Sequence, residues 1–323
     1  MIRQRPVELL APARNVECAM AAVDHGADAV YIGASRFGAR ASAGNSVEDI
    51  ARVVEYAHTF RVKVYVTVNT ILKDEELPET EKLVWALYRA GVDALIVQDV
   101  ALLELDLPPI PLHASTQMDN RTPEKVKFLH GLGFSQVVLA RELSLAEIQA
   151  VHAACDVPLE VFVHGALCVS YSGQCYVSQH CFGRSANRGE CAQFCRLKFD
   201  MVDSDGRMIE QGRHLLSLKD MNRGSDLERL LDAGVTSLKI EGRLKDVAYV
   251  KNVTAWYRSR LDEIFKCRPE YRRASSGQVS LAFTPCLEKS FNRGFTRYFL
   301  DGDGERRPWE MYRRVRSQAV CQR

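Results

Sequence analysis

The stretch Gly91-Val-Asp-Ala-Leu-Ile-Val-Gln98 joins a helix-ending glycine to a short apolar strand, and this unit recurs along the chain. Comparable glycines precede apolar runs at Gly26, Gly133 and Gly234. Glycine readily takes the left-handed turn that ends a helix. The runs are continuous rather than alternating, which is typical of strands covered on both faces in parallel sheets. The chain therefore reads as an alternation of helices and buried strands.

Eight strands and five intervening helices are predicted from these patterns. The strands are expected at 7–12, 29–33, 62–69, 94–98, 111–116, 136–141, 159–164 and 237–241. The helices are expected at 15–25, 47–59, 75–90, 122–131 and 144–154, the last beginning with a Ser144/Glu147 capping box. This order predicts an α/β fold, a TIM-type (β/α)8 barrel over about residues 5–265. A doubly wound open sheet is the rival architecture. No G-x-G-x-x-G motif follows the first strand, so nothing indicates dinucleotide binding.

Two segments lie outside the repeating unit. An insertion at 165–224 separates strands seven and eight and contains a predicted hairpin, 198–201 with 207–210 around Asp205-Gly206. Residues 266–323 are expected to form a short C-terminal extension or a truncated second domain, and they contain the basic and aromatic run Phe291-Asn-Arg-Gly-Phe-Thr-Arg297.

The bulk composition is that of a globular protein. The 323 residues are 46% hydrophobic and 26% charged, with a formal net charge of +2. This small net charge does not indicate DNA binding, although a local basic surface could still bind RNA. No apolar run follows the N-terminal arginines and none approaches the roughly 18 residues of a membrane span. We therefore expect a cytoplasmic protein without a membrane span.

Five of the ten cysteines fall between residues 168 and 195. Cys168, Cys175, Cys191 and Cys195 have the spacing C-x6-C-x15-C-x3-C, and Cys181 lies among them. Clustered thiols in a reducing compartment indicate a soft metal rather than disulfides. Zinc ribbons usually carry C-x2-C pairs, so the spacing favours an iron–sulfur cluster over structural zinc. A set of buried apolar cysteines is the remaining alternative.

Polar side chains follow most of the predicted strands, where TIM barrels carry their chemistry. We expect Arg141 and Arg243 to bind carboxylates, and Glu142, His164 and Glu241 to be acid–base candidates. His164 could instead orient the cluster. The neutral candidates for substrate binding are Asn69 and Gln117. Neither G-x-S-x-G nor H-E-x-x-H occurs, so no conventional protease mechanism is indicated.

The cysteine-rich insertion carries a family resemblance. The stretch Phe162-Val-His-Gly-Ala-Leu-Cys-Val-Ser-Tyr-Ser-Gly-Gln-Cys-Tyr-Val-Ser178 resembles the signature of the collagenase-like peptidases, family thirty-two of the unassigned peptidases. Its continuation is similar to Gly183-Arg-Ser-Ala-Asn-Arg-Gly-Glu-Cys-Ala-Gln-Phe-Cys-Arg196. Tyr171 in this signature is a further substrate-binding candidate. Residues 238–257 most resemble the members that make 5-hydroxycytidine in 23S ribosomal RNA.

The resemblance implies a TIM-like barrel and oxygen-independent hydroxylation of RNA. It also implies a 4Fe-4S cluster on Cys168, Cys175, Cys191 and Cys195, and prephenate as a possible cosubstrate. Ribosomal RNA or its precursor would be the partner. Sister members hydroxylate tRNA or a quinone precursor, and others are named for collagenase activity, so a peptidase is one alternative. A partner-dependent iron–sulfur barrel protein, requiring a second chain, is another.

Overall fold

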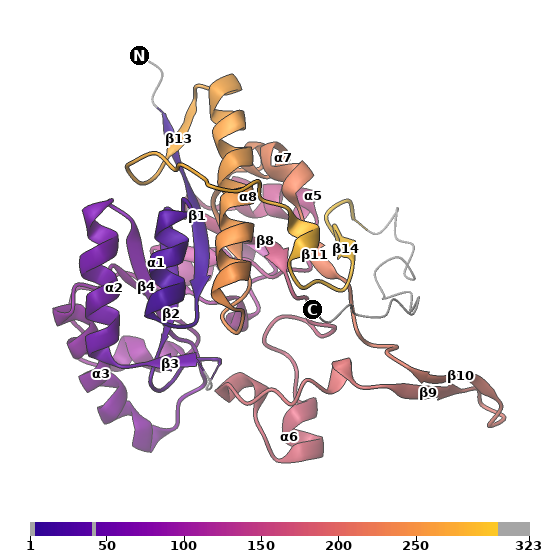
Figure 1. Ribbon diagram of the computed structural model, residues 1–323. Helices are drawn as coiled ribbons and strands as arrows, with labels where there is room; N and C mark the ends of the chain where they lie inside the picture. Colours follow the sequence, from indigo (N-terminus) through magenta and orange to yellow (C-terminus); the bar gives the residue numbers. More distant parts are fainter. Residues whose placement is uncertain (1–3, 41–42, 303–323) are drawn as a thin grey trace.

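The computed structural model describes residues 4–40 and 43–302, and its centre is a closed parallel β-barrel (Figure 1). The eight barrel strands are β1 (Arg5–Ala13), β2 (Ala29–Ala34), β4 (Lys63–Val68), β5 (Ala94–Val97), β6 (Leu112–Ala114), β7 (Gln136–Val138), β8 (Leu159–Gly165) and β12 (Val235–Ile240). They pair in this order, and β12 pairs in parallel with both β8 and β1. The ring is thereby closed, so the predicted (β/α)8 barrel is confirmed and the open sheet is wrong.

Helices connect most of the strands on the outside of the barrel. They are α1 (Val16–Asp24), α2 (Val47–Thr59), α3 (Leu77–Arg89), α4 (Pro123–Gly131), α5 (Leu145–Ala154), α7 (Leu227–Asp232) and α8 (Val247–Cys267). Only a 3-10 helix, Val100–Glu104, stands between β5 and β6. The predicted capping box is confirmed, because the Ser144 hydroxyl accepts from the Glu147 amide while the Glu147 carboxylate accepts from the Ser144 amide.

The alternation of side chains along each strand separates two layers. Outward-facing residues such as Leu9 and Leu238, which are register partners, join the apolar layer shared with the helices. The inward face is more polar. Here the Glu8 carboxylate accepts from Tyr65 Oη at 2.5 Å and from Ser237 Oγ at 2.7 Å. Burial raises the pKa of Glu8 to about 7 in spite of these bonds. The barrel interior is therefore built to hold polar groups.

The cysteine-rich insertion lies at the end of the barrel where β1 ends (Figure 1). It contains α6 (Val177–Phe182), the hairpin of β9 (Phe199–Val202) and β10 (Met208–Arg213), and β11 (Asp220–Asn222). The hairpin was predicted from its Asp-Gly turn and is confirmed. Strand β11 pairs antiparallel with the end of β8, which ties the insertion back to the barrel.

Residues after α8 return to the barrel as far as they are described. Strand β13 (Tyr271–Arg273) pairs with β1, and β14 (Phe295–Thr296) pairs with β11. Leu287 and Leu300 are buried in the same core as the barrel helices. The short β3 (Gly44–Asn45) pairs in parallel with the end of β2. The predicted extension continues to residue 323, but 303–323 lie outside the described residues. None of the described helices is long and apolar enough to cross a membrane.

Candidate functional site

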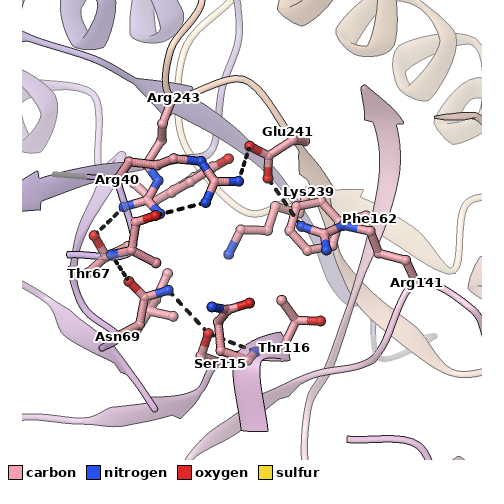
Figure 2. Close-up of a pocket in the computed structure, with 14 residues that line it drawn as sticks. Arg40, Thr67, Asn69, Ser115, Thr116, Arg141, Phe162, Lys239, Glu241 and Arg243 are labelled. Atoms are coloured by element: carbon pink, nitrogen blue, oxygen red, sulfur yellow. Dashed lines mark hydrogen bonds and ion pairs between the residues drawn. The ribbon is translucent and has the colours of Figure 1, made fainter. Parts of the chain in front are cut away.

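A polar pocket opens at the carboxyl ends of the barrel strands (Figure 2). It encloses about 390 Å³ of empty space, including its open mouth. Its lining residues are Tyr31, Ala39, Arg40, Thr67, Asn69, Ile96, Ser115, Thr116, Gln117, Arg141, Phe162, Lys239, Glu241 and Arg243. Five predicted site residues, Asn69, Gln117, Arg141, Glu241 and Arg243, are therefore brought together here, as expected for a TIM-type barrel.

Positive charge dominates the pocket. Four cationic side chains line it, from Arg40, Arg141, Lys239 and Arg243, against the single lining carboxylate of Glu241. Figure 2 shows Arg40 and Arg141 reaching Glu241, with Nη2 to carboxylate distances of 3.7 Å and 3.3 Å. Burial alone would raise the pKa of Glu241, but the charges of Arg40, Arg141 and Arg243 outweigh it and lower that pKa. Glu241 is thus ionised, and the lining keeps an excess of cations suited to an anion.

Arg243 is almost completely buried beside this carboxylate. Its Nη1 donates to Thr67 Oγ1 at 2.5 Å, and only 5% of the residue is exposed. Burial lowers its pKa to about 10, so the guanidinium still carries its charge at neutral pH. A buried cation is costly unless an anion compensates it, and the nearby Glu241 carboxylate is already ion-paired with Arg40 and Arg141. Arg243 is therefore placed to bind an anionic group that enters the pocket.

Lys239 and Arg141 rest against aromatic rings at the pocket wall. Lys239 Nζ lies 4.4 Å from the Tyr31 ring centroid, and the Arg141 guanidinium lies 4.1 Å from that of Phe162. Lys239 also binds the buried Glu160 carboxylate at 2.6 Å. The Glu160 carboxylate neutralises the charge of Lys239. The arginines are therefore the pocket cations whose charge is less fully neutralised.

The opposite wall is neutral. Asn69 accepts from the Ala39 amide at 3.0 Å and donates to Ser115 Oγ at 3.3 Å. Ser115 Oγ in turn accepts from the Gln117 amide at 3.2 Å. These bonds fix the orientation of the Asn69 amide and the turn that carries Gln117. Both predicted substrate-binding residues thus present polar atoms opposite the arginines.

His164 lies behind the pocket wall rather than in its lining. Only 3% of it is exposed, and the rings of Tyr249, Tyr257 and Phe295 surround it at 5.5–6.1 Å between centroids. Its Nδ1 lies 3.3 Å from Tyr257 Oη. Burial lowers the pKa of His164 to about 3, so the ring is neutral at physiological pH. Its predicted acid–base role stays a prediction that the burial does not favour.

Glu142 contacts the insertion and Tyr171 lies within it, and neither residue lines the pocket. The Glu142 carboxylate accepts from Ser172 N at 2.8 Å and from Ser172 Oγ at 3.0 Å. Tyr171 is 58% exposed and stacks under the Arg121 guanidinium at 4.1 Å. Glu142 therefore anchors the insertion to the barrel, and its predicted role in acid–base chemistry, like that of Tyr171 in substrate binding, stays a prediction.

Arg188 of the insertion strengthens this attachment, and Arg196 joins two parts of the insertion to each other. Arg188 binds the Glu76 carboxylate with both terminal nitrogens, at 2.9 Å and 2.6 Å, and donates to Ile71 O at 2.7 Å. The Arg188 contact holds the pKa of Glu76 down at about 2. Arg196 donates to the Leu167 and Leu218 carbonyls. The insertion is thus fixed to the barrel end at several separated points.

Four of the clustered cysteines act on one another electrostatically. Burial raises the pKa of the Cys168 thiol, and the charges of Cys175 and Cys191 raise it further. Burial likewise raises the pKa of Cys195, where the charges of Cys168, Cys191 and Cys175 contribute. Cys181 is exposed on α6. The four predicted ligands therefore share one neighbourhood.

These thiols fit a soft-metal centre in ligand type and in proximity. Among residues 4–40 and 43–302, however, no group of three or more His, Cys, Asp or Glu side chains is arranged to hold a metal ion. The cysteines are near one another, but their sulfur atoms do not converge on one metal position. The ligand assignment therefore stays a prediction.

Several pocket residues were not identified from the sequence. Arg40 lies in the loop after β2, where no motif marks it. Lys239 stands inside the apolar run of β12 and shares the inward face with Glu241. A charged side chain within a buried strand is the signal that could have pointed to Lys239.

The family follows from comparison with known proteins. The model of Peptidase family U32 matches residues 14–309. The chain belongs to this family. It is 56% identical over 295 residues to the 23S rRNA 5-hydroxycytidine C2501 synthase of Escherichia coli, covering 91% of this chain and 45% of that protein. It is 38% identical over 312 residues to tRNA hydroxylation protein P1 of Bacillus subtilis, covering 94% and 72%.

A third relative has a different name. The chain is 33% identical over 304 residues to a collagenase of Porphyromonas gingivalis, covering 89% of this chain and 72% of that protein. The chain thus spans less than half of the E. coli synthase and nearly three quarters of the other two relatives. The family is the one that the cysteine-rich signature predicted.

Proposed function

We propose that this chain forms the barrel part of an iron–sulfur-dependent, oxygen-independent RNA hydroxylase that makes 5-hydroxycytidine in 23S ribosomal RNA. The observation that carries the proposal is the cationic pocket at the barrel mouth, near which the cysteine-rich insertion is attached through Glu142. The 56% identity to a 5-hydroxycytidine synthase supports this choice of base and RNA.

The pocket supports a carboxylated cosubstrate, for which prephenate is our candidate. Arg141 and Arg243 would bind the carboxylates, since a guanidinium can form paired hydrogen bonds with such a group. Asn69 and Gln117 would orient the polar remainder from the opposite wall. Glu241 holds Arg40 and Arg141 in place through its ion pairs and, as an ionised carboxylate, can accept a proton from a bound hydroxyl group.

Cys168, Cys175, Cys191 and Cys195 would hold a 4Fe-4S cluster. When bound, such a cluster would supply electron transfer, or a Lewis-acidic iron if one iron lacks a protein ligand. The chain's contribution is to hold the insertion beside the pocket through Glu142 and Arg188, while Arg196 joins parts of the insertion to each other. The buried neutral His164, at the end of β8, would position the strand from which the insertion starts.

The test uses an E. coli strain that lacks its 5-hydroxycytidine synthase. Expression of the chain should restore 5-hydroxycytidine in 23S rRNA, measured by mass spectrometry of nucleosides. Arg243→Lys should abolish it, because lysine cannot reproduce the planar guanidinium contact. The matched control is Arg52→Lys on the exposed face of α2, which should leave it intact. Unmodified cytidine with a folded, cluster-containing wild-type chain would overturn the proposal.

The collagenase relative makes a peptidase the second candidate. That function predicts gelatin cleavage by anaerobically purified protein, with loss of cleavage in Arg243→Lys. Hydroxylated uridine in tRNA, with unmodified 23S rRNA, would instead favour the activity named for the B. subtilis relative.

A further inference from the structure

A second, larger hollow lies beside the first turns of α8. It encloses about 1260 Å³ of empty space, open solvent included, and shares no lining residue with the polar pocket. We call it the α8 groove. Its lining residues are Lys245, Asp246, Ala248, Tyr249, Lys251, Asn252, Phe283, Thr284, Lys289, Ser290 and Phe291. The groove therefore lies between α8 and the segment that precedes β14.

The charge of the α8 groove is positive. Three lysines line it, Lys245, Lys251 and Lys289, against one carboxylate. That carboxylate, Asp246, is occupied as the N-cap of α8, where it accepts from the Tyr249 amide at 2.8 Å. The amino-terminal end of this 21-residue helix adds its own partial positive charge. The groove thus attracts anions although the whole chain is nearly neutral.

Exposed aromatic rings stand among these cations. Phe291 is 61% exposed and Phe283 is 40% exposed. Lys245 Nζ lies 4.2 Å from the Phe291 ring centroid, and the Arg293 guanidinium lies 5.0 Å from it. Two exposed rings among cations form an apolar patch with a polar rim, the kind of surface that marks an interaction site. Cations that follow phosphates, beside aromatic rings that stack on bases, are the usual features of single-strand binding grooves.

The outer wall of the groove is fixed in place. Asn252 of α8 donates to Cys286 O and to Ser290 Oγ, each at 2.7 Å, and accepts from Cys286 N at 2.8 Å. Leu287 in the same segment is 2% exposed. These contacts hold the turn that presents Lys289 and Phe291, so little ordering would be needed when a ligand binds.

The groove also adjoins the barrel mouth. Tyr249 lines the groove, and its hydroxyl donates to Glu241 O at 3.0 Å. Lys245 follows the pocket residue Arg243 by only two positions. A chain molecule bound along the groove would therefore arrive at the edge of the polar pocket.

We propose that the α8 groove binds a single-stranded segment of RNA, with phosphates at Lys245, Lys251 and Lys289 and one base stacked on Phe291. This inference rests on the proposed function, for which it names an RNA contact outside the pocket. The mixture of cations and exposed rings favours RNA over a gelatin-like peptide, which offers no comparable negative charge.

The test measures binding of a fluorescein-labelled single-stranded RNA of about 12 nucleotides by anisotropy over a range of salt concentrations. Lys251→Glu with Lys289→Glu should weaken binding at least tenfold. The double variant should also flatten the salt dependence by roughly 1.4 in log–log slope, because two lysines no longer neutralise phosphates. Phe291→Ala should weaken binding about tenfold with the slope unchanged, and Phe291→Trp should retain it.

The matched controls are Lys127→Glu and Phe128→Ala on α4, where an exposed lysine also stands beside a ring that is 57% exposed. Both should bind RNA as the wild type does. Equal losses in the controls and the groove variants would overturn the inference, as would groove variants that bind normally or a groove that takes gelatin peptides instead. These outcomes would not affect the hydroxycytidine measurement, which tests the proposed function separately. Conversely, loss confined to the groove variants supports the groove even if no hydroxycytidine forms.

Discussion

The contact between the insertion and the barrel mouth depends on a glycine. A Cβ atom built on Gly173 would lie 2.1 Å from the carbonyl oxygen of Gln117, a pocket residue. Ordinary contact begins at 3.4 Å, so Gly173→Ala must open this contact by about 1.3 Å. The backbone of Gly173 also has a φ of +78°, which costs an alanine about 1–2 kcal/mol. The substitution should therefore shift the insertion away from Gln117.

Gly183 provides the matched control within the same insertion. Its φ is +63°, but a Cβ there meets nothing within 4 Å. Gly183→Ala should lower the free energy of unfolding only through the cost of the positive φ. Gly173→Ala should lower it by a further overpacking cost of about 1–3 kcal/mol. Denaturant unfolding measures this difference, and iron content measures its consequence for the cluster. Equal stabilities of the two variants, with equal iron, would refute the close contact that fixes the insertion over the mouth.

Three further predictions concern buried ionisable groups. The protonated Glu8 carboxyl stabilises the folded state, because burial raises its pKa from 4.5 to about 7. Its contribution to the free energy of unfolding is fully present below pH 4.5 and is lost as the pH rises through 7. Glu8→Gln should remove that slope, a difference of about 3 kcal/mol by pH 8 in urea titrations; an unchanged slope would contradict it. Glu241→Gln should destabilise the protein by about 3 kcal/mol, since it leaves buried arginines unpaired, and citrate should stabilise this variant more than the wild type in thermal unfolding. His164 should keep a constant Hε1 chemical shift between pH 5 and 8, because burial holds its pKa near 3, and a titration midpoint within that range would contradict the low pKa.

The barrel could be predicted from sequence because its strands are strongly marked. Every strand of the ring overlaps a predicted run, since strands covered on both faces are rich in apolar residues even where single inward-facing positions such as Glu8 and Lys239 are polar. The boundaries were less exact, as for β7, predicted to residue 141 and ending at Val138. Helix α8 was not singled out, although Val250, Val253 and Leu261 recur with helical spacing. The paired strands after α8 are too short to leave a pattern.

The sequence predicted those site residues whose position depends only on the order of the strands. Asn69, Arg141, Glu241 and Arg243 follow strands and meet at one end of the barrel. Glu142 follows a strand too, but its side chain holds Ser172, a partner 30 residues away that no local pattern reveals. The placement of Arg40 also depends on tertiary structure, because the loop after β2 brings it to Glu241 at the end of β12, with β1 between the two strands.

The central claim is that the insertion holds an iron–sulfur cluster on four cysteines beside the pocket. The most direct measurement is iron and acid-labile sulfide per chain in anaerobically purified protein, together with the EPR spectrum of its reduced form. The account predicts about four of each in the wild type and in Cys181→Ser, and a loss in Cys168→Ser, Cys175→Ser, Cys191→Ser and Cys195→Ser. Iron-free wild-type protein with bound zinc, or a loss confined to Cys181→Ser, would contradict it.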